Sequence, residues 1–186
     1  MRGRPSVFPA RAAVLLLAAA CSGVDTATTS QENALKATKP SDTTIVLTRT
    51  FAAPRETVFA ALTRPEHLRQ WMHTTERALV ACEVDLCVGG ALRYVYQRSN
   101  GGKLEVRGVY QTVDPPRGFV YEESYDFSPL RLLASTVLEE KGGKTVLRQT
   151  LGYGSRQGRD EDFDGVASSA AEAFDRLEGY LAEVRE

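Results

Sequence analysis

The sequence has few of the residues that build metal centres and disulfide-framed proteins. It carries three cysteines and two histidines in 186 residues, and three cysteines are too few for a disulfide framework. No run approaches the ~18 apolar residues of a membrane-spanning helix, which excludes a multi-span membrane protein. The 23 basic and 24 acidic residues nearly balance, which argues against a nucleic-acid-binding surface. The remaining composition, 42% hydrophobic and 25% charged, is that of a globular domain with an extra segment.

The first twenty residues have the layout of an export signal. Three arginines and no acidic residue accompany the apolar core Ala12–Ala20, which is too short to span a membrane as a helix. Cys21 follows three alanines directly, and this segment resembles a bacterial lipobox. That resemblance implies thioether lipidation of Cys21 and cleavage before it. Lipoboxes usually carry leucine where Ala18 stands, so plain secretion and an ordinary Cys21 remain alternatives.

We expect three segments: a signal peptide at 1–20, a flexible tether from a lipidated cysteine at 21–41, and one folded domain at 42–186. The tether is rich in Ser, Thr and Ala, and such a segment cannot bury enough apolar surface to offset its ordering entropy. It would reach roughly 25 Å as a random coil. Without the first twenty residues the chain has 20 basic and 24 acidic residues, so nucleic acid is not an expected partner. The expected location is the outer side of a membrane, periplasmic or at the cell surface, with the lipid as anchor.

The rest of the sequence predicts one strand, two short helices, six more strands and a long helix. The predicted strands are 44–51, 79–85, 91–98, 103–113, 118–127, 131–140 and 144–153. In the last segment, apolar residues recur at three- and four-residue steps from Phe163 to Val184, which indicates an amphipathic helix. Such a helix needs a broad apolar surface, and a curved antiparallel sheet supplies one. The fold class is therefore α+β.

Several blocks of sequence resemble one family. Residues 49–71 read RTFAAPRETVFAALTRPEHLRQW, Gly108-Val109-Tyr110 precedes Asp114-Pro115-Pro116, and residues 174–181 read FDRLEGYL. These blocks are similar to the SRPBCC/START-like superfamily, and within it to homologues of the activator of the heat-shock-protein-90 ATPase, C-terminal domain. The resemblance implies a helix-grip fold in which seven antiparallel strands curve around the C-terminal helix. It also implies an apolar cavity between sheet and helix, where similar proteins bind lipids, sterols, hormones or polyketides.

Alternation along the strand at 118–127 supplies candidates for such a cavity. One face carries Phe119, Tyr121, Glu123, Tyr125 and Phe127, and we expect this aromatic face to point toward the helix. Glu123 is its one carboxylate, and a buried carboxylate needs a partner or a raised pKa. The alternative is that Glu123 reaches water at a sheet end or pairs with Arg107.

The candidate ligand-binding residues come from several predicted elements. They are Trp71, Tyr94, Tyr96, Tyr121, Glu123, Tyr125, Gln149 and Ala170. An apolar cavity with a few polar groups suits a small hydrophobic or amphipathic molecule; in the alternative interpretation the tyrosines are core residues with satisfied hydroxyls. Ser169-Ala170 stand where the family usually has Gly-Trp, which implies a cavity larger by an indole.

Metal and disulfide chemistry have little support. His67 and His73 are six residues apart, a spacing that does not place both on one helical face, so we expect no metal and no cofactor. The acidic residues of 160–164 fall at the expected start of the last helix, where the helix dipole favours them. Cys82 and Cys87 are separated by roughly 16 Å in an extended strand, beyond the ~7 Å limit of a disulfide. Only a sharp turn between them would allow pairing.

We therefore expect an exported, lipid-anchored domain that binds a small hydrophobic ligand, because no catalytic set is assembled in the sequence. The alternative is a cavity enzyme of cyclase, dehydratase or hydrolase type, with Glu123 and His73 as the candidate acid and base. A co-chaperone that activates an ATPase follows from the resemblance alone. The export signal argues against it, since that chaperone and its ATP are cytosolic.

Overall fold

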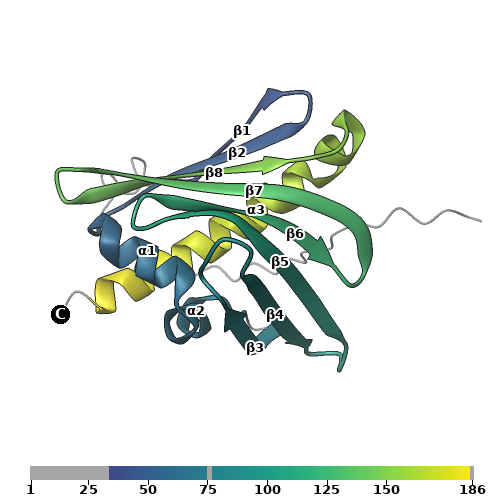
Figure 1. Cartoon of the computed structure of the whole chain (residues 1–186), viewed down its shortest axis with the longest axis horizontal. Helices are drawn as coiled ribbons and strands as arrows, with labels where there is room; N and C mark the ends of the chain where they lie inside the picture. The colour runs from purple at the N-terminus through teal and green to yellow at the C-terminus, as the bar shows by residue number, and fades with distance from the viewer. Residues whose placement is uncertain (1–33, 75–76, 185–186) are drawn as a thin grey trace, which may run out of the picture.

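The computed structural model describes residues 34–74 and 77–184. One antiparallel sheet curves around a long C-terminal helix, with two short helices beside that helix (Figure 1). The strands are β1 (Lys36–Ser41), β2 (Thr44–Phe51), β3 (Arg77–Val84), β4 (Ala91–Arg98), β5 (Lys103–Asp114), β6 (Gly118–Tyr125), β7 (Ser128–Lys141) and β8 (Lys144–Gly152), and the helices are α1 (Arg55–Thr63), α2 (Pro65–Trp71) and α3 (Arg156–Glu183). The strand order is β1-β2-β8-β7-β6-β5-β4-β3. The predicted α+β helix-grip fold is confirmed.

The sheet of the described chain has eight strands, one more than predicted. The additional strand is β1, which lies inside the segment expected to be a tether. It pairs antiparallel with β2, with Thr38 opposite Val46. Its lysines and proline are residues that exposed edge strands carry to discourage further pairing. The same polar composition thus suits an edge strand and a tether, and the predicted end of the tether at residue 41 is wrong.

The chain before β1 carries the remaining predictions about the N-terminus. The signal peptide at 1–20, the lipidation site Cys21 and the tether up to residue 33 lie outside the described residues. Among residues 34–74 and 77–184, no helix is both long enough and apolar enough to cross a membrane.

The long helix α3 crosses the concave face of the sheet (Figure 1). The helix begins earlier than predicted, because Ser155 caps it: its hydroxyl accepts a hydrogen bond of 3.1 Å from the Gly158 N–H. Phe174, Leu177 and Leu181 are buried in its second half. The acidic residues of 160–164 consequently lie beyond the first turn of α3, and their assignment to the helix start is wrong.

The short helices α1 and α2 close one end of the space under the sheet. Trp71 fixes their arrangement, because its indole N–H donates to the Ala61 carbonyl of α1 at 3.0 Å. From α3, the Arg176 Nε donates to the Trp71 carbonyl at 3.0 Å. Trp71 therefore joins all three helices at this end.

Candidate ligand-binding cavity

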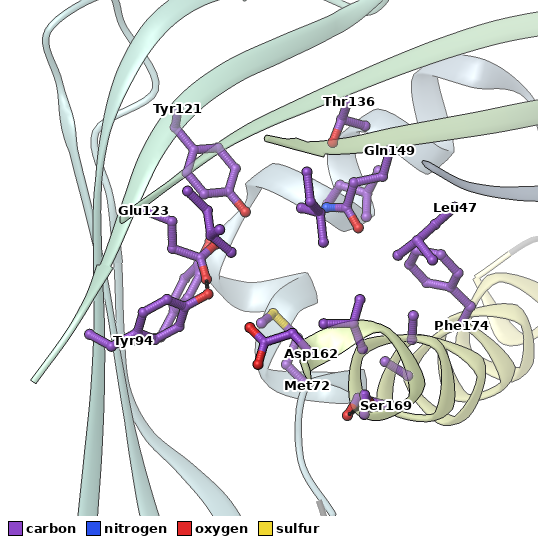
Figure 2. A pocket seen from close by; sticks show the side chains of 18 of the residues that line it. Leu47, Met72, Tyr94, Tyr121, Glu123, Thr136, Gln149, Asp162, Ser169 and Phe174 are labelled. Atoms are coloured by element: carbon purple, nitrogen blue, oxygen red, sulfur yellow. Dashed lines mark hydrogen bonds between the residues drawn. The ribbon is translucent and has the colours of Figure 1, made fainter. Parts of the chain in front are cut away.

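A cavity of about 380 Å³ lies between the concave face of the sheet and α3. This volume is in the range of small-molecule binding sites. Most of its wall is apolar, with leucines from the sheet and alanines and Phe174 from α3 (Figure 2). Polar side chains interrupt this wall at a few places, and their chemistry decides what the cavity can hold.

The structure places all eight candidate ligand-binding residues in the cavity wall. Tyr121, Glu123 and Tyr125 come from one face of β6, as strand alternation predicts. The others come from α2 (Trp71), β4 (Tyr94 and Tyr96), β8 (Gln149) and α3 (Ala170). Their role in binding a ligand stays a prediction.

Glu123 is held in the wall by tyrosine hydroxyls. The Tyr125 hydroxyl donates a hydrogen bond to Glu123 Oε1, and the Tyr121 hydroxyl is close enough to stabilise the same carboxylate. Burial raises the pKa of Glu123 above its ordinary value of 4.5, while the two hydroxyls oppose that rise. The alternative pairing with Arg107 does not occur, because the Arg107 Nε lies 2.6 Å from Glu105 instead.

A glycine on β5 makes room for this arrangement. Gly108 lies opposite Glu123 in the β5–β6 register. A Cβ atom at Gly108 would lie 2.9 Å from Leu92 Cγ and 3.0 Å from Cδ2 of the Tyr121 ring. Both separations are shorter than van der Waals contact, so a larger residue at Gly108 would displace Leu92 or the Tyr121 ring.

Asp162 is a cavity residue that sequence reasoning missed. It reaches the cavity from the N-terminal part of α3, and its carboxylate is directed toward the side that carries Glu123 (Figure 2). Burial, followed by repulsion from Glu161, raises the pKa of Asp162 above 3.8. The helical spacing of Asp162, Val166, Ala170 and Ala173 places all four on one face, and this spacing was the available signal.

The tyrosine hydroxyls near the carboxylates stay protonated at neutral pH. Burial raises the pKa of Tyr96 to about 12 and that of Tyr94 well above 10. The pKa values of Tyr125 and Tyr153 are raised first by burial and then by Glu123 and Asp162. Both hydroxyls therefore lie within electrostatic range of both carboxylates.

The part of the cavity wall that β7 and β8 form carries two uncharged polar side chains. Thr136 of β7 and Gln149 of β8 are register partners, and both point into the cavity from the sheet (Figure 2). They can donate and accept hydrogen bonds without adding charge.

His73, the other candidate acid–base residue, is exposed and does not line the cavity. The structure therefore does not bring it together with Glu123. Cys82 is buried, Cys87 is exposed, and both are unpaired. The described part of the chain holds no group of three side chains that could ligate a metal.

Residues 52–182 match the family described as Activator of Hsp90 ATPase homolog 1-like protein. The chain belongs to this family. A search among curated proteins finds no match.

Solved structures resemble this member of the family over most of its length. A protein of Rhodobacter sphaeroides is 26% identical with a TM-score of 0.78, covering 81% of this chain and 99% of its own. Protein Ms6760 of Mycobacterium smegmatis is 22% identical with a TM-score of 0.69, covering 77% of this chain and 94% of its own. DynU16, described as a putative protein in the dynemicin biosynthetic locus, is 19% identical with a TM-score of 0.60, covering 77% of this chain and 48% of its own.

In this family member, small residues of α3 leave the cavity open. Gly165, Ser169, Ala170 and Ala173 all line it. The Ser169 hydroxyl donates to the Gly165 carbonyl at 2.7 Å, so its polarity is used within the helix. Ala170, at the position where the resemblance leads us to expect tryptophan, lines the cavity with a side chain of one carbon, and the expected enlargement by an indole stays a prediction.

Proposed function

We propose that this protein binds a small, largely hydrophobic molecule in the cavity between the sheet and α3. The observation that carries the proposal is the cavity of about 380 Å³, lined mostly by aliphatic and aromatic side chains with polar groups at a few positions. A well-packed domain core leaves few voids larger than a water molecule, so a space of this size is a feature that a ligand would fill. DynU16, a putative protein in the dynemicin biosynthetic locus, shares this fold.

We further propose that the N-terminal segment directs export and that a lipid on Cys21 anchors the protein. The arginine-rich start, the nine-residue apolar core and the small residues before Cys21 support this. An anchored domain would hold its cavity close to a membrane, where hydrophobic molecules concentrate. Replacing Cys21 with alanine should abolish incorporation of labelled fatty acid and release the protein from the membrane fraction. Equal membrane retention of the original protein and of Cys21→Ala would contradict the anchor.

A second candidate function is acid–base catalysis by Glu123. Its position in the cavity and its raised pKa support this role, because such groups mark active sites more often than chance. Once a ligand is identified, Glu123→Gln should stop its conversion and leave a folded protein. Continued turnover in that variant would exclude Glu123 as the acid or base.

The binding proposal is tested by native mass spectrometry of the full chain carrying Cys21→Ala, which is expected to leave the membrane fraction and is purified without detergent or organic solvent. The same sample is measured again after denaturation. A discrete additional mass that disappears on denaturation is the expected result, and it gives the mass of the ligand. In parallel, the apo protein is titrated with N-phenyl-1-naphthylamine, a neutral apolar fluorescent dye. An apo mass together with no saturable dye binding would overturn the proposal.

A further inference from the structure

Two carboxylates line the cavity from opposite layers of the fold. Glu123 comes from β6 of the sheet, and Asp162 comes from α3 (Figure 2). Both lie within electrostatic range of the Tyr125 and Tyr153 hydroxyls. The potential at this end of the cavity is therefore negative when the two acids are ionised.

Within the described residues, no cation neutralises Glu123. Its partners are the Tyr121 and Tyr125 hydroxyls, and no basic side chain contributes to its pKa. Two arginines reach the cavity wall, but both are engaged elsewhere. The guanidinium of Arg77 lies over the Tyr96 ring, 5.2 Å from its centroid, and Arg176 is bound by Glu172 at 2.6 Å and by the Trp71 carbonyl.

Aromatic rings surround the same end of the cavity. Tyr94, Tyr121, Tyr125 and Tyr153 all line it. The face of an aromatic ring attracts a cation, and this attraction is strongest where water is excluded. Tyrosine rings together with carboxylates make a favourable site for an ammonium group, whereas a carboxylate or phosphate would be repelled by both acids.

From this arrangement we infer that the ligand is a hydrophobic amine whose protonated nitrogen binds at Glu123, with Asp162 and the tyrosine rings adding to the attraction. The inference rests on the proposed binding function and names the chemical class of its ligand. The apolar body of the amine lies against Leu47, Leu147 and Phe174, toward the middle of α3. The nitrogen supplies the positive charge that this part of the chain does not give to Glu123.

Three probes that share one apolar body test the inference. They are 2-(1-naphthyl)ethylamine, 2-(1-naphthyl)ethanol and 1-naphthaleneacetic acid, which are positive, neutral and negative at pH 7.5. Isothermal titration calorimetry of the full chain carrying Cys21→Ala gives a Kd for each. We expect the amine to bind at least about tenfold more tightly than the alcohol, and the acid most weakly of the three.

The matched variants are Glu123→Gln and Glu122→Gln. Glu122 is the neighbour on the opposite face of β6, exposed and paired with Arg131 at 2.9 Å. Glu123→Gln should reduce the preference for the amine to less than about threefold while the alcohol keeps its affinity, which shows that the cavity is intact. Glu122→Gln should retain the full preference.

The outcomes separate this inference from the binding proposal. Equal affinity for amine and alcohol, or an amine preference that survives Glu123→Gln, would overturn the inference. Saturable binding of N-phenyl-1-naphthylamine would still support the cavity as a binding site in that case. If the dye binds and none of the three probes does, the inference fails alone. If neither dye nor probes bind and native mass spectrometry shows only the apo mass, both fail.

Discussion

Arg49 on β2 and Asp175 on α3 form an ion pair in which the Arg49 Nη1 donates to Asp175 Oδ1 at 2.5 Å. The Nη2 of the same guanidinium lies 2.5 Å from Glu178, one turn further along α3. Arg49 occupies the inward-facing row of β2 and is only 6% exposed, so its charge depends on partners from the helix. The pair thereby sets the position of α3 along the sheet, and with it the residues of α3 that line the cavity.

This geometry predicts that removing the two carboxylates lowers the free energy of unfolding more than removing the arginine does. The double variant Asp175→Asn, Glu178→Gln leaves a buried guanidinium without a counter-ion. It should lower the free energy of unfolding by about 2–4 kcal/mol. This loss is smaller than for a fully buried ion pair, because Asp175 is largely exposed. Arg49→Met keeps an apolar side chain of similar length and should cost less than about 1.5 kcal/mol. Urea denaturation measures both. A larger loss in Arg49→Met would show that the ion pair itself stabilises the fold.

The strands were predictable from sequence where one face of the sheet is buried. Because side chains alternate with a period of two, the face of β6 that carries Tyr121, Glu123 and Tyr125 could be identified without a structure. β1 could not be predicted in this way, because it forms a strand by pairing with β2 and its own apolar content is small. Ala37 of β1 and Leu35, which directly precedes the strand, pack against the core, and two residues make no periodic pattern.

The site was predictable only in part, for a related reason. The candidates on β6 were chosen from the alternation of that strand, which sufficed for Glu123, whereas Ala170 was chosen from the family resemblance. Asp162 was assigned to the helix start because the apolar stripe of α3 begins at Phe163. The cap at Ser155 adds two turns before that stripe, and packing against the sheet then turns Asp162 into the cavity. The convergence of Glu123 and Asp162 is a tertiary property that neither local pattern contains.

A shortened chain tests the role of β1. A protein that begins at residue 42 loses the whole β1–β2 pairing. It also loses the Ser41 carbonyl that accepts a hydrogen bond from the buried Arg159, and the 2.9 Å ion pair of Lys39 with Asp160. We expect it to be less stable than a chain beginning at residue 34 by at least about 2 kcal/mol. Thermal denaturation, followed by circular dichroism, compares the two chains. Equal stability would mean that β1 does not contribute to the stability of the folded domain and behaves as part of the tether.

Filling the cavity should abolish binding without unfolding the protein. Ala170→Trp places an indole in the space that Ala170 leaves open, and we expect the affinity for N-phenyl-1-naphthylamine to fall at least about tenfold. The free energy of unfolding should stay within about 2 kcal/mol of the original, because added burial opposes any strain. Ala182→Trp, at an exposed position near the end of the same helix, is the control. Unchanged dye affinity in Ala170→Trp would place the dye outside the cavity.

Glu123 should make the empty protein less stable as the pH rises. Its pKa in the folded state is raised above 4.5, so its stabilising contribution is complete below the unfolded pKa and is lost as the pH increases through the folded pKa. Glu123→Gln remains neutral and avoids this loss. Its melting temperature should therefore exceed that of the original protein at pH 8 but not at pH 4. A difference that is independent of pH, or also present in Glu122→Gln, would contradict an ionised, uncompensated Glu123.

The affinity for 2-(1-naphthyl)ethylamine should change with pH in the opposite sense to the stability of the empty protein. An aliphatic amine keeps its charge up to about pH 10, so Glu123 and Asp162, whose pKa values are raised, are the groups lining the site that gain charge as the pH rises toward neutrality. Burial holds the pKa values of Tyr94, Tyr121, Tyr125 and Tyr153 above 10.

The amine should therefore bind more tightly as the pH rises through the raised pKa values of the two acids, with a plateau once both are ionised. The naphthyl alcohol is the internal control, because its affinity has no reason to follow either carboxylate. Calorimetric titrations at pH 5 and pH 8 measure both probes on the same preparation. In Glu123→Gln most of the increase should disappear, while in Asp162→Asn a part of it should remain, since Glu123 still ionises. An affinity for the amine that falls over this range would mean that protonated Glu123 is the binding form, and that the cavity selects a hydrogen-bond acceptor instead of a cation.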